Sequence, residues 1–380
     1  MSAERWPGAR RILCVRLDTL GDVLMTTPAL RALRGAGSAG PQDRRGSNPG
    51  RTITLLTSPA GAEIAGLVPE VDGVITYDAP WVKSSAPAGG PEADRDMAKR
   101  LRAGGFDAAV IFTVYSQSPL PAAMICHLAD IPLRLAHCRE NPYRLLTDWV
   151  AEPEPERIVR HEVRRQLDLV AAVGATTSDE TLSLEVPPRA RRAASEVVGG
   201  LGLEDAKTWA VVHPGASASS RRYPAESFAA AGRRLAGSGC SLVFTGSPSE
   251  VDLVEGIRAA MGAPSDSLAG RLGLAELAAV IDLAPLVVTN NTGPAHIAAA
   301  VGTPVVDLYA LTNPQHTPWG VASRVLSHDV PCRWCYKSVC PEGHHNCLRL
   351  VTPEEVAGAA LELLAERGTG LEHRALLGGP

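Results

Sequence analysis

The stretch LAPLVVTNNTGPAHIAAAVGTPVVDLYALTNPQHTPW (283–319) has the pattern of a strand, a polar turn, a helix and a second strand. An apolar run at 286–289 has the length of a strand, and Pro294 suits the first position of a helix over 295–301. A Gly-Thr-Pro sequence then ends this helix ahead of a second buried strand at 305–309. The unit predicts an α/β fold with a parallel sheet.

The turn after the first of these strands carries residues suited to binding an anion. In an open α/β sheet, ligands bind beyond the carboxyl ends of the strands, where the N–H groups of a helix favour phosphate. Thr292, Gly293 and His296 would therefore face a bound anion. An ordinary βαβ turn with a structural histidine is the alternative, because Asn-Thr-Gly-Pro alone is a weak signal.

Strand and helix patterns alternate along both halves of the chain. A boundary is expected within 174–189, which carries turn residues and two consecutive prolines. The predicted domains are 1–180 and 190–350, followed by a helix over 352–367. Two such halves facing each other suggest a ligand bound between them.

Composition and charge narrow the classes of function. Of 380 residues, 45% are hydrophobic and 21% are charged, which is typical of a soluble globular protein. The net charge of −4 gives no electrostatic reason to expect nucleic acid as a partner. No apolar run approaches the ~20 residues of a membrane span, and the N-terminus lacks a signal-peptide pattern. The expected location is cytoplasmic, and peripheral membrane contact stays open. Gly/Ser/Pro-rich stretches at 35–50 and 83–93 are predicted loops.

Three further polar turns follow predicted strands. Asp22 begins a helix after the first strand, where an N-terminal capping role is the alternative to chemistry. The turn HPGASASSRR (213–222) joins Ser217 to Arg221, and arginine can grip phosphate oxygens in a bidentate manner. Glu250 follows the next strand, where a carboxylate can accept from a ribose hydroxyl or merely cap its helix.

Several enzyme classes are disfavoured by motifs that the sequence lacks. No GxGxxG follows the first strand, which argues against a dinucleotide dehydrogenase. No GxxxxGK[ST] and no GxSxG occurs either, so the P-loop ATPase and serine hydrolase classes are disfavoured.

Four segments in order resemble motifs of the heptosyltransferase family, the ADP-heptose glycosyltransferases of glycosyltransferase family 9. They are ILCVRLDTLGDVLMTTPALRALR (12–34), VVHPGASASSRRYPAESF (211–228), FTGSPSE (244–250) and VVTNNTGPAHIAAAVGTPVVDLYALTNP (287–314). The resemblance implies a GT-B fold, in which two Rossmann-like domains face each other across a cleft. It also implies that the C-terminal helix packs back on the N-terminal domain. Transfer in the family is inverting and needs no cofactor.

The same resemblance implies roles for individual residues. The family's catalytic base falls on Asp22, and Arg16 corresponds to a basic residue on the acceptor side. Arg221 stands where the family often has a lysine at the diphosphate of the donor. Asn291 replaces the aspartate of the family's D-T-G-x-x-H segment, so a role that depends on that negative charge is in doubt. The other predicted donor-binding residues are Ser217, Glu250, Thr292, Gly293 and His296.

The function implied is transfer of a heptose, or a related sugar, from an ADP-sugar to a hydroxyl acceptor. The acceptor could be lipopolysaccharide core, another surface glycan or a natural product. Two alternatives are a GT-B sugar-nucleotide epimerase and a degenerate nucleotide-sugar-binding protein.

Four of the eight cysteines lie close together in the sequence, as Cys332-x2-Cys335-x4-Cys340-x6-Cys347. A CxxC pair with two further cysteines is consistent with a structural zinc or iron site in a reducing compartment. Protein-modifying heptosyltransferases are similar in holding an iron through four cysteines. Disulfides or free thiols are the alternative, because the spacing is not that of a standard zinc finger.

Overall fold

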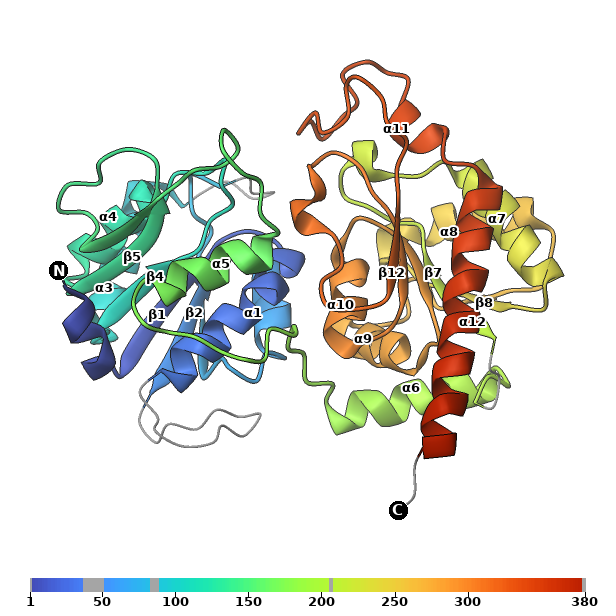
Figure 1. Cartoon of the computed structure of the whole chain (residues 1–380), viewed down its shortest axis with the longest axis horizontal. Coiled ribbons are helices and arrows are strands. Elements are labelled where there is room, and N and C mark those ends of the chain that lie inside the picture. Colours follow the sequence, from blue (N-terminus) through green and yellow to red (C-terminus); the bar gives the residue numbers. More distant parts are fainter. Residues whose placement is uncertain (1, 37–50, 83–88, 205–207, 378–380) are drawn as a thin grey trace. The chain divides into compact units, whose positions relative to one another are not determined.

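The computed structural model describes residues 2–36, 51–82, 89–204 and 208–377, so the predicted loops at 35–50 and 83–93 lie mostly outside it. The chain divides into two compact units, Met1–Glu185 and Val186–Pro380. Each unit has its own parallel sheet with helices on both faces (Figure 1).

The sheet of the first unit has the strand order β3-β2-β1-β4-β5-β6, and every neighbouring pair is parallel. Helices α3 and α4 cover one face, where a cluster of buried apolar side chains forms the core. The strands are β1 (Arg11–Arg16), β2 (Thr52–Thr57), β3 (Gly73–Thr76), β4 (Ala108–Ile111), β5 (Leu133–Cys138) and β6 (Asp148–Ala151). The helices are η1 (Ser2–Gly8), α1 (Leu20–Gly35), α2 (Pro59–Ala65), α3 (Gly90–Ala103), α4 (Leu120–Leu128) and α5 (Glu162–Ala171).

The second unit repeats this arrangement in the order β12-β11-β10-β7-β8-β9, again with parallel pairs. Its strands are β7 (Trp209–His213), β8 (Ser241–Phe244), β9 (Asp266–Ser267), β10 (Val287–Asn290), β11 (Val305–Leu308) and β12 (Ser323–Leu326). Its α-helices are α6 (Pro188–Gly200), α7 (Ala225–Gly237), α8 (Val251–Met261), α9 (Leu274–Leu283), α10 (Gly293–Val301), α11 (Asn346–Arg349) and α12 (Pro353–Leu377). Short 3-10 helices are η2 (Ser219–Arg221), η3 (Pro248–Glu250) and η4 (Pro314–His316).

Both sheets reverse their strand order at one point, between β1 and β4 in the first unit and between β7 and β10 in the second. At such a point the connections leave toward opposite sides, and a crevice opens at the carboxyl ends of the two strands. The fold therefore offers one ligand-binding position in each unit.

The α/β class with two Rossmann-like units, predicted from the sequence, is confirmed.

The C-terminal helix α12 packs on its own unit. Its apolar residues Val356, Ala360 and Leu363 belong to the core of the second unit, and the helix packs on α7, β11 and β12 (Figure 1). Its packing on the N-terminal domain stays a prediction. The helix continues to Leu377, past the predicted end at 367. Among the described residues, none of the helices combines the length and apolar character that a bilayer crossing requires.

One carboxylic acid lies inside the core of the second unit. Asp307, in β11, is fully buried, and neither of its side-chain oxygens has a hydrogen-bond partner among the described residues. Burial raises the pKa of Asp307 to about 8, although the nearby Arg221 guanidinium opposes the shift. Because the charged form is poorly solvated there, Asp307 is mainly protonated at neutral pH.

This acid makes the stability of the protein depend on pH. The folded-state pKa lies above the unfolded value, so the folded chain holds an extra proton between about pH 4 and 8, and stability falls as pH rises through that window. We expect the free energy of unfolding of the wild type, relative to Asp307→Asn, to fall by about 1–3 kcal/mol from pH 5 to pH 8. Urea unfolding at several pH values measures this difference. The exposed Asp252→Asn variant, as control, should keep the wild-type slope; equal slopes for wild type and Asp307→Asn would contradict the assignment.

Candidate functional site

A single buried arginine gathers three carboxylates at the end of β1. Arg16 has no exposed surface, and its Nε lies 3.0 Å from Asp18 Oδ2. Its two Nη atoms lie 2.9 Å from Asp22 Oδ1 and 2.7 Å from Glu162 Oε1. The acids come from the turn after β1, the start of α1 and the start of α5, so one guanidinium joins three elements. Arg16 was predicted to bind the acceptor; the structure shows it buried and enclosed by acids, and its contact with an acceptor stays a prediction.

Asp22, the predicted catalytic base, lies in the first turn of α1. Its Oδ2 accepts hydrogen bonds from the backbone N–H of Thr19, at 3.0 Å, and from the Thr19 hydroxyl, at 2.8 Å. The first contact satisfies the N–H of Thr19, the residue that precedes α1, as the capping alternative required. The side chain still keeps 14% of its surface exposed. The arrangement therefore fixes the orientation of the carboxylate and leaves part of it accessible.

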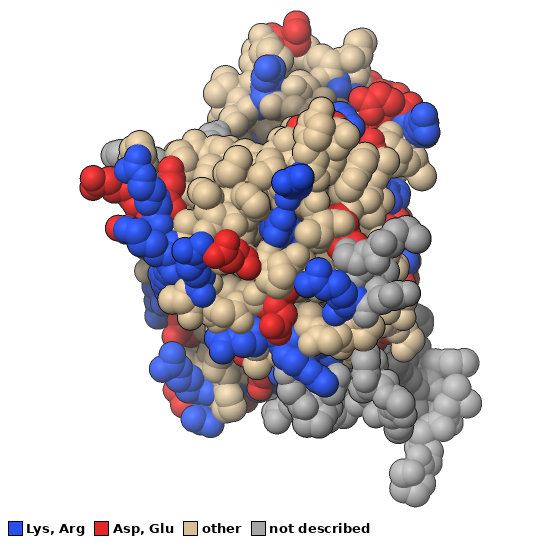
Figure 2. All heavy atoms as spheres, turned by 90° about the vertical axis from the view of Figure 1, so that its left-hand side faces the viewer, with Lys and Arg blue, Asp and Glu red and all other residues tan. Residues whose placement is uncertain are grey.

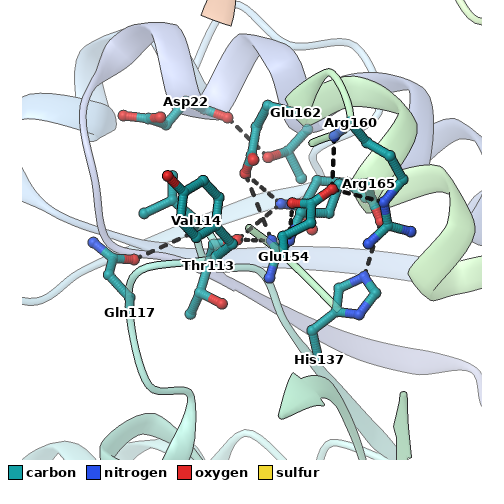
Figure 3. Close-up of polar contacts among 12 residues, drawn as sticks. Asp22, Thr113, Val114, Gln117, His137, Glu154, Arg160, Glu162 and Arg165 are labelled. Atoms are coloured by element: carbon teal, nitrogen blue, oxygen red, sulfur yellow. Dashed lines mark hydrogen bonds and ion pairs between the residues drawn. The ribbon is translucent and has the colours of Figure 1, made fainter. Parts of the chain in front are cut away.

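Helix α5 supplies the second layer of this site (Figure 3). Arg165 and Gln166 both donate to the backbone carbonyl of Thr113, which follows β4, and the Gln166 bond is 3.0 Å long. The Arg165 Nε also donates to Glu152 Oε2, at 3.0 Å. Arg165 and Gln166 are buried, so α5 anchors the carboxyl end of β4 through hydrogen bonds from one charged and one neutral side chain.

Asp18 and Gln117 are site residues that the sequence did not reveal. Gln117 Nε2 donates to Asp18 Oδ1, at 2.6 Å, and both residues line a cavity of about 340 Å³ at the crevice between β1 and β4. Burial raises the pKa of Asp18 to about 6, against the opposing effect of Arg16. The only sequence signal was a second acid in the turn after β1, four residues before Asp22.

In the second unit, Asn290 ties the two turns at the β7–β10 crevice together. Its Nδ2 donates to the carbonyl oxygens of Pro214, at 2.8 Å, and Gly215, at 3.3 Å, while its Oδ1 accepts from the N–H of Tyr223, at 3.0 Å. The predicted turns 213–222 and 290–293 are therefore joined by one buried amide.

Glu250 approaches the same turn from η3. Its Oε2 accepts from the N–H and the hydroxyl of Ser247, at 2.8 and 2.9 Å, and lies 3.9 Å from His213 Nε2. The Glu250 carboxylate lies directly over Gly215, where a side chain would displace it. The Oε1 atom has no hydrogen bond among the described residues, so it is available to a ligand. Burial lowers the pKa of His213, a neighbour that the sequence did not reveal.

The remaining predicted donor residues differ in exposure. Ser217 is exposed, and Arg221 is partly buried, with an Nε atom that has no hydrogen-bond partner among the described residues. Thr292 precedes the first residue of α10, Gly293, and both are partly exposed. His296, one turn into the helix, is buried. The N–H groups at the start of α10 therefore open on the crevice.

Asn291 does not present its side chain outward. It is 2% exposed, and its Nδ2 lies 3.5 Å from the carbonyl oxygen of Ala310, at the limit of a hydrogen bond. The role of Asn291 in binding the donor, implied by its position in the motif, stays a prediction.

The four clustered cysteines lie in the loop between β12 and α12. All four are free and partly exposed, whereas the other four cysteines are buried. Cys332 Sγ is 3.8 Å from His344 Nε2, and burial together with the neighbouring thiols raises the pKa of Cys347. As the described side chains lie, no three histidines, cysteines or acids are arranged to hold a metal ion. The structural metal therefore stays a prediction.

Charges are mixed on the face of the molecule shown in Figure 2. Lys and Arg side chains lie next to Asp and Glu side chains around an area without charge. This face has no extended basic patch of the kind that nucleic-acid binding requires.

Comparisons with known proteins identify relatives of this chain. The lipooligosaccharide heptosyltransferase 2 of Campylobacter jejuni is 29% identical over 168 residues, which cover 43% of this chain and 53% of that protein. The chain spans about half the length of the curated relatives it matches.

Solved structures show the same fold over nearly the whole chain. A glycosyl transferase family 9 protein from Veillonella parvula superposes with a TM-score of 0.77 and 24% identity, covering 94% of this chain and 98% of that one. The ADP-heptose heptosyltransferase II of E. coli gives a TM-score of 0.69 with 21% identity, covering 94% and 99%. Residues 95–346 match the sequence model of glycosyltransferase family 9. Since that match extends over more than half of the chain, the resemblance found in its motifs is confirmed, and the protein belongs to glycosyltransferase family 9, the heptosyltransferase family.

Proposed function

We propose that this protein is an inverting glycosyltransferase that moves a heptose, or a related sugar, from an ADP-sugar to a hydroxyl group. The family match over 95–346 is the observation that carries the proposal, because it includes every turn predicted to bind the donor. Relatives named for lipopolysaccharide and ADP-heptose favour this donor. The acceptor is a hydroxylated compound, such as lipopolysaccharide core, another surface glycan or a natural product.

In the proposed reaction, Asp22 takes the proton of the acceptor hydroxyl. The oxygen then attacks the anomeric carbon as the bond to the diphosphate breaks, and ADP leaves with the electron pair. Attack from the face opposite the leaving group inverts the configuration. Arg16, 2.9 Å from Asp22, holds that carboxylate in its orientation through an ion pair.

The second unit would hold the donor through its crevice. The N-terminus of α10 directs the N–H groups near Thr292 and Gly293 toward a phosphate, and the helix dipole adds a partial positive charge. Arg221, in the turn that Asn290 joins to β10, would supply a full positive charge. Glu250 Oε1 would accept from a hydroxyl of the nucleoside, while Oε2 stays bound to Ser247. The leaving diphosphate is thus stabilised without a metal ion.

Replacing the proposed base tests its role directly. We expect Asp22→Asn to lower kcat by about 10²–10⁴-fold, because the amide cannot accept the proton, while the affinity for the donor stays within about twofold. Activity assays and calorimetric donor titration measure the two quantities. Asn retains an oxygen that accepts from Thr19, so the fold should persist. Asp96→Asn, at an exposed acid of α3, should leave both quantities unchanged. A collapse of donor binding in Asp22→Asn would make Asp22 a structural residue.

The identity of the donor is tested by titration calorimetry. Full-length protein is titrated with ADP-heptose, GDP-mannose and UDP-glucose, and we expect the adenine nucleotide to bind most tightly. Glu250→Gln should weaken the binding of ADP-heptose by about tenfold if Oε1 accepts from the nucleoside. Tighter binding of the uridine donor would overturn the assignment of ADP.

Elemental analysis of protein purified without chelator tests the predicted structural metal. If the four-cysteine loop binds zinc or iron, the wild type contains the metal and the Cys332→Ser/Cys335→Ser variant loses it. Cys240→Ala, which alters a buried cysteine outside the loop, should retain it. If the wild type contains no metal and its thiols react with a thiol reagent, the four cysteines are free and the metal prediction is wrong. Four thiolate ligands would leave no open coordination position, so such a metal would serve structure.

A further inference from the structure

The loop between β12 and α12 is attached to the connection that follows β11. The backbone N–H of Tyr336 donates to the carbonyl oxygen of Leu311, at 3.0 Å. The Tyr336 hydroxyl accepts from the N–H of Asn313, at 3.2 Å. Both partners lie shortly after the carboxyl end of β11, so this part of the loop stays at the edge of the sheet where the strands end (Figure 1).

The same loop is also attached to the turn predicted to bind the diphosphate. The carbonyl oxygen of Ser338 accepts from the N–H of Ser220, at 3.1 Å, and from the Ser219 hydroxyl, at 3.2 Å. Ser219 and Ser220 belong to the turn at 213–222 after β7, and Arg221 is the next residue. The loop therefore contacts the segment that carries the proposed diphosphate arginine.

The two attachments place Lys337 at the crevice of the second unit. β11 and β7 are the two neighbours of β10, so a segment bonded to the connections after both of them spans the carboxyl end of β10. Asn290, the last residue of β10, accepts from Tyr223 in one attached connection. The next residue, Asn291, lies 3.5 Å from the carbonyl oxygen of Ala310 in the other. Lys337 is the residue between the two attachments, so its backbone is held near the start of α10.

The charge of Lys337 is available to a ligand. Its side chain is exposed, and its ammonium group forms no ion pair or hydrogen bond with the residues that the structure describes. An ammonium group has three N–H donors and no acceptor, and charged donors of this kind form strong hydrogen bonds with phosphate oxygens. The group is therefore suited to an anionic ligand in the crevice.

A second cation at this crevice has a chemical use in the proposed reaction. When the bond to the sugar breaks, the diphosphate takes the electron pair and gains negative charge. Arg221 would supply one full positive charge, and the N-terminus of α10 a partial charge of about +0.5. A further ammonium group would stabilise the leaving diphosphate more than the intact donor, as fixed positive charges do where negative charge develops.

From these contacts we infer that Lys337 is a second cation for the diphosphate of the donor, held at the crevice by the attachments on either side of it. The ligand is a nucleoside diphosphate, alone or joined to a sugar. The inference rests on the proposed transferase function, to which it adds a binding residue from the loop after the edge strand β12. Arg221 and Lys337 would approach the diphosphate from different segments of the same unit.

Titration of the full-length protein with ADP and with adenosine tests this role, because only ADP carries the diphosphate. Binding is followed by NMR at a fixed salt concentration. We expect Lys337→Gln to weaken the binding of ADP by about five- to tenfold and to leave that of adenosine within about twofold. Lys337→Arg keeps the positive charge, so its affinity for ADP should stay within about threefold of the wild-type value.

Arg333→Gln is the matched control, because it removes a positive charge from the same loop outside the attached segment. Arg333 pairs with Asp329, at 2.8 Å, and its guanidinium lies 4.3 Å from the centre of the Trp334 ring. This variant should bind both ligands within about twofold of the wild type. An equal loss of ADP binding in Arg333→Gln and Lys337→Gln would indicate general attraction by the loop's charge and would overturn the inference.

The attachment itself is tested with Tyr336→Phe, which removes the hydroxyl that accepts from Asn313. If the attachment acts through Lys337, this change should weaken ADP binding by about two- to threefold in the wild type and have no further effect in Lys337→Gln. A purely structural role would give the same loss in both backgrounds, and that result would overturn the positioning of Lys337.

Unchanged ADP binding in Lys337→Gln, or an equal loss of adenosine binding, would overturn the inference and leave the proposed function standing. Failure of the wild-type protein to bind ADP would instead reject the proposed function.

Discussion

The first unit depends on the ion cluster around Arg16. Removing a guanidinium from water is unfavourable, and the cost is offset only because three carboxylates and their hydrogen bonds surround it. The cluster connects β1, α1 and α5, which are far apart in the chain. It thereby fixes the position of the proposed base and the acid of the neighbouring cavity. Removing the guanidinium would deprive all three carboxylates of their shared cation, and losing a buried ionic partner ordinarily costs several kcal/mol.

Most of the fold could be predicted from local patterns. The unit at 283–319 appears as β10, α10 and β11 because short apolar runs are separated by Gly, Pro and Asn, whose conformational preferences act locally. The sequence patterns did not predict helix α6 or strand β6. Pro187-Pro188 indicated a break, yet Pro188 is the first residue of α6, a position that proline favours. The edge strand β6 alternates between partly buried and exposed residues, so it lacks the apolar run of a central strand.

The sequence located the candidate-site residues that lie in turns at the edge of a sheet. It did not reveal those that depend on contacts between residues far apart in the chain. Glu250, Thr292 and Gly293 lie in turns that the strand pattern alone locates. Glu162 lies 146 residues from Arg16 in the sequence, so only the folded chain reveals that they pair. Whether Asn291 faces a ligand or the protein also depends on packing, because strand register determines which neighbours surround it.

The repeated strand order has an evolutionary consequence. Each crevice is built from residues of its own unit, with acids and an indole in the first and turn amides with arginine in the second. Drift in the pocket-lining side chains of the first unit can therefore change the proposed acceptor while the unit proposed to bind the nucleotide-sugar stays unaltered. Exchanging units between homologues would be the corresponding engineering route. New acceptor ranges could then arise in this lineage with no change in the residues proposed to bind the leaving diphosphate.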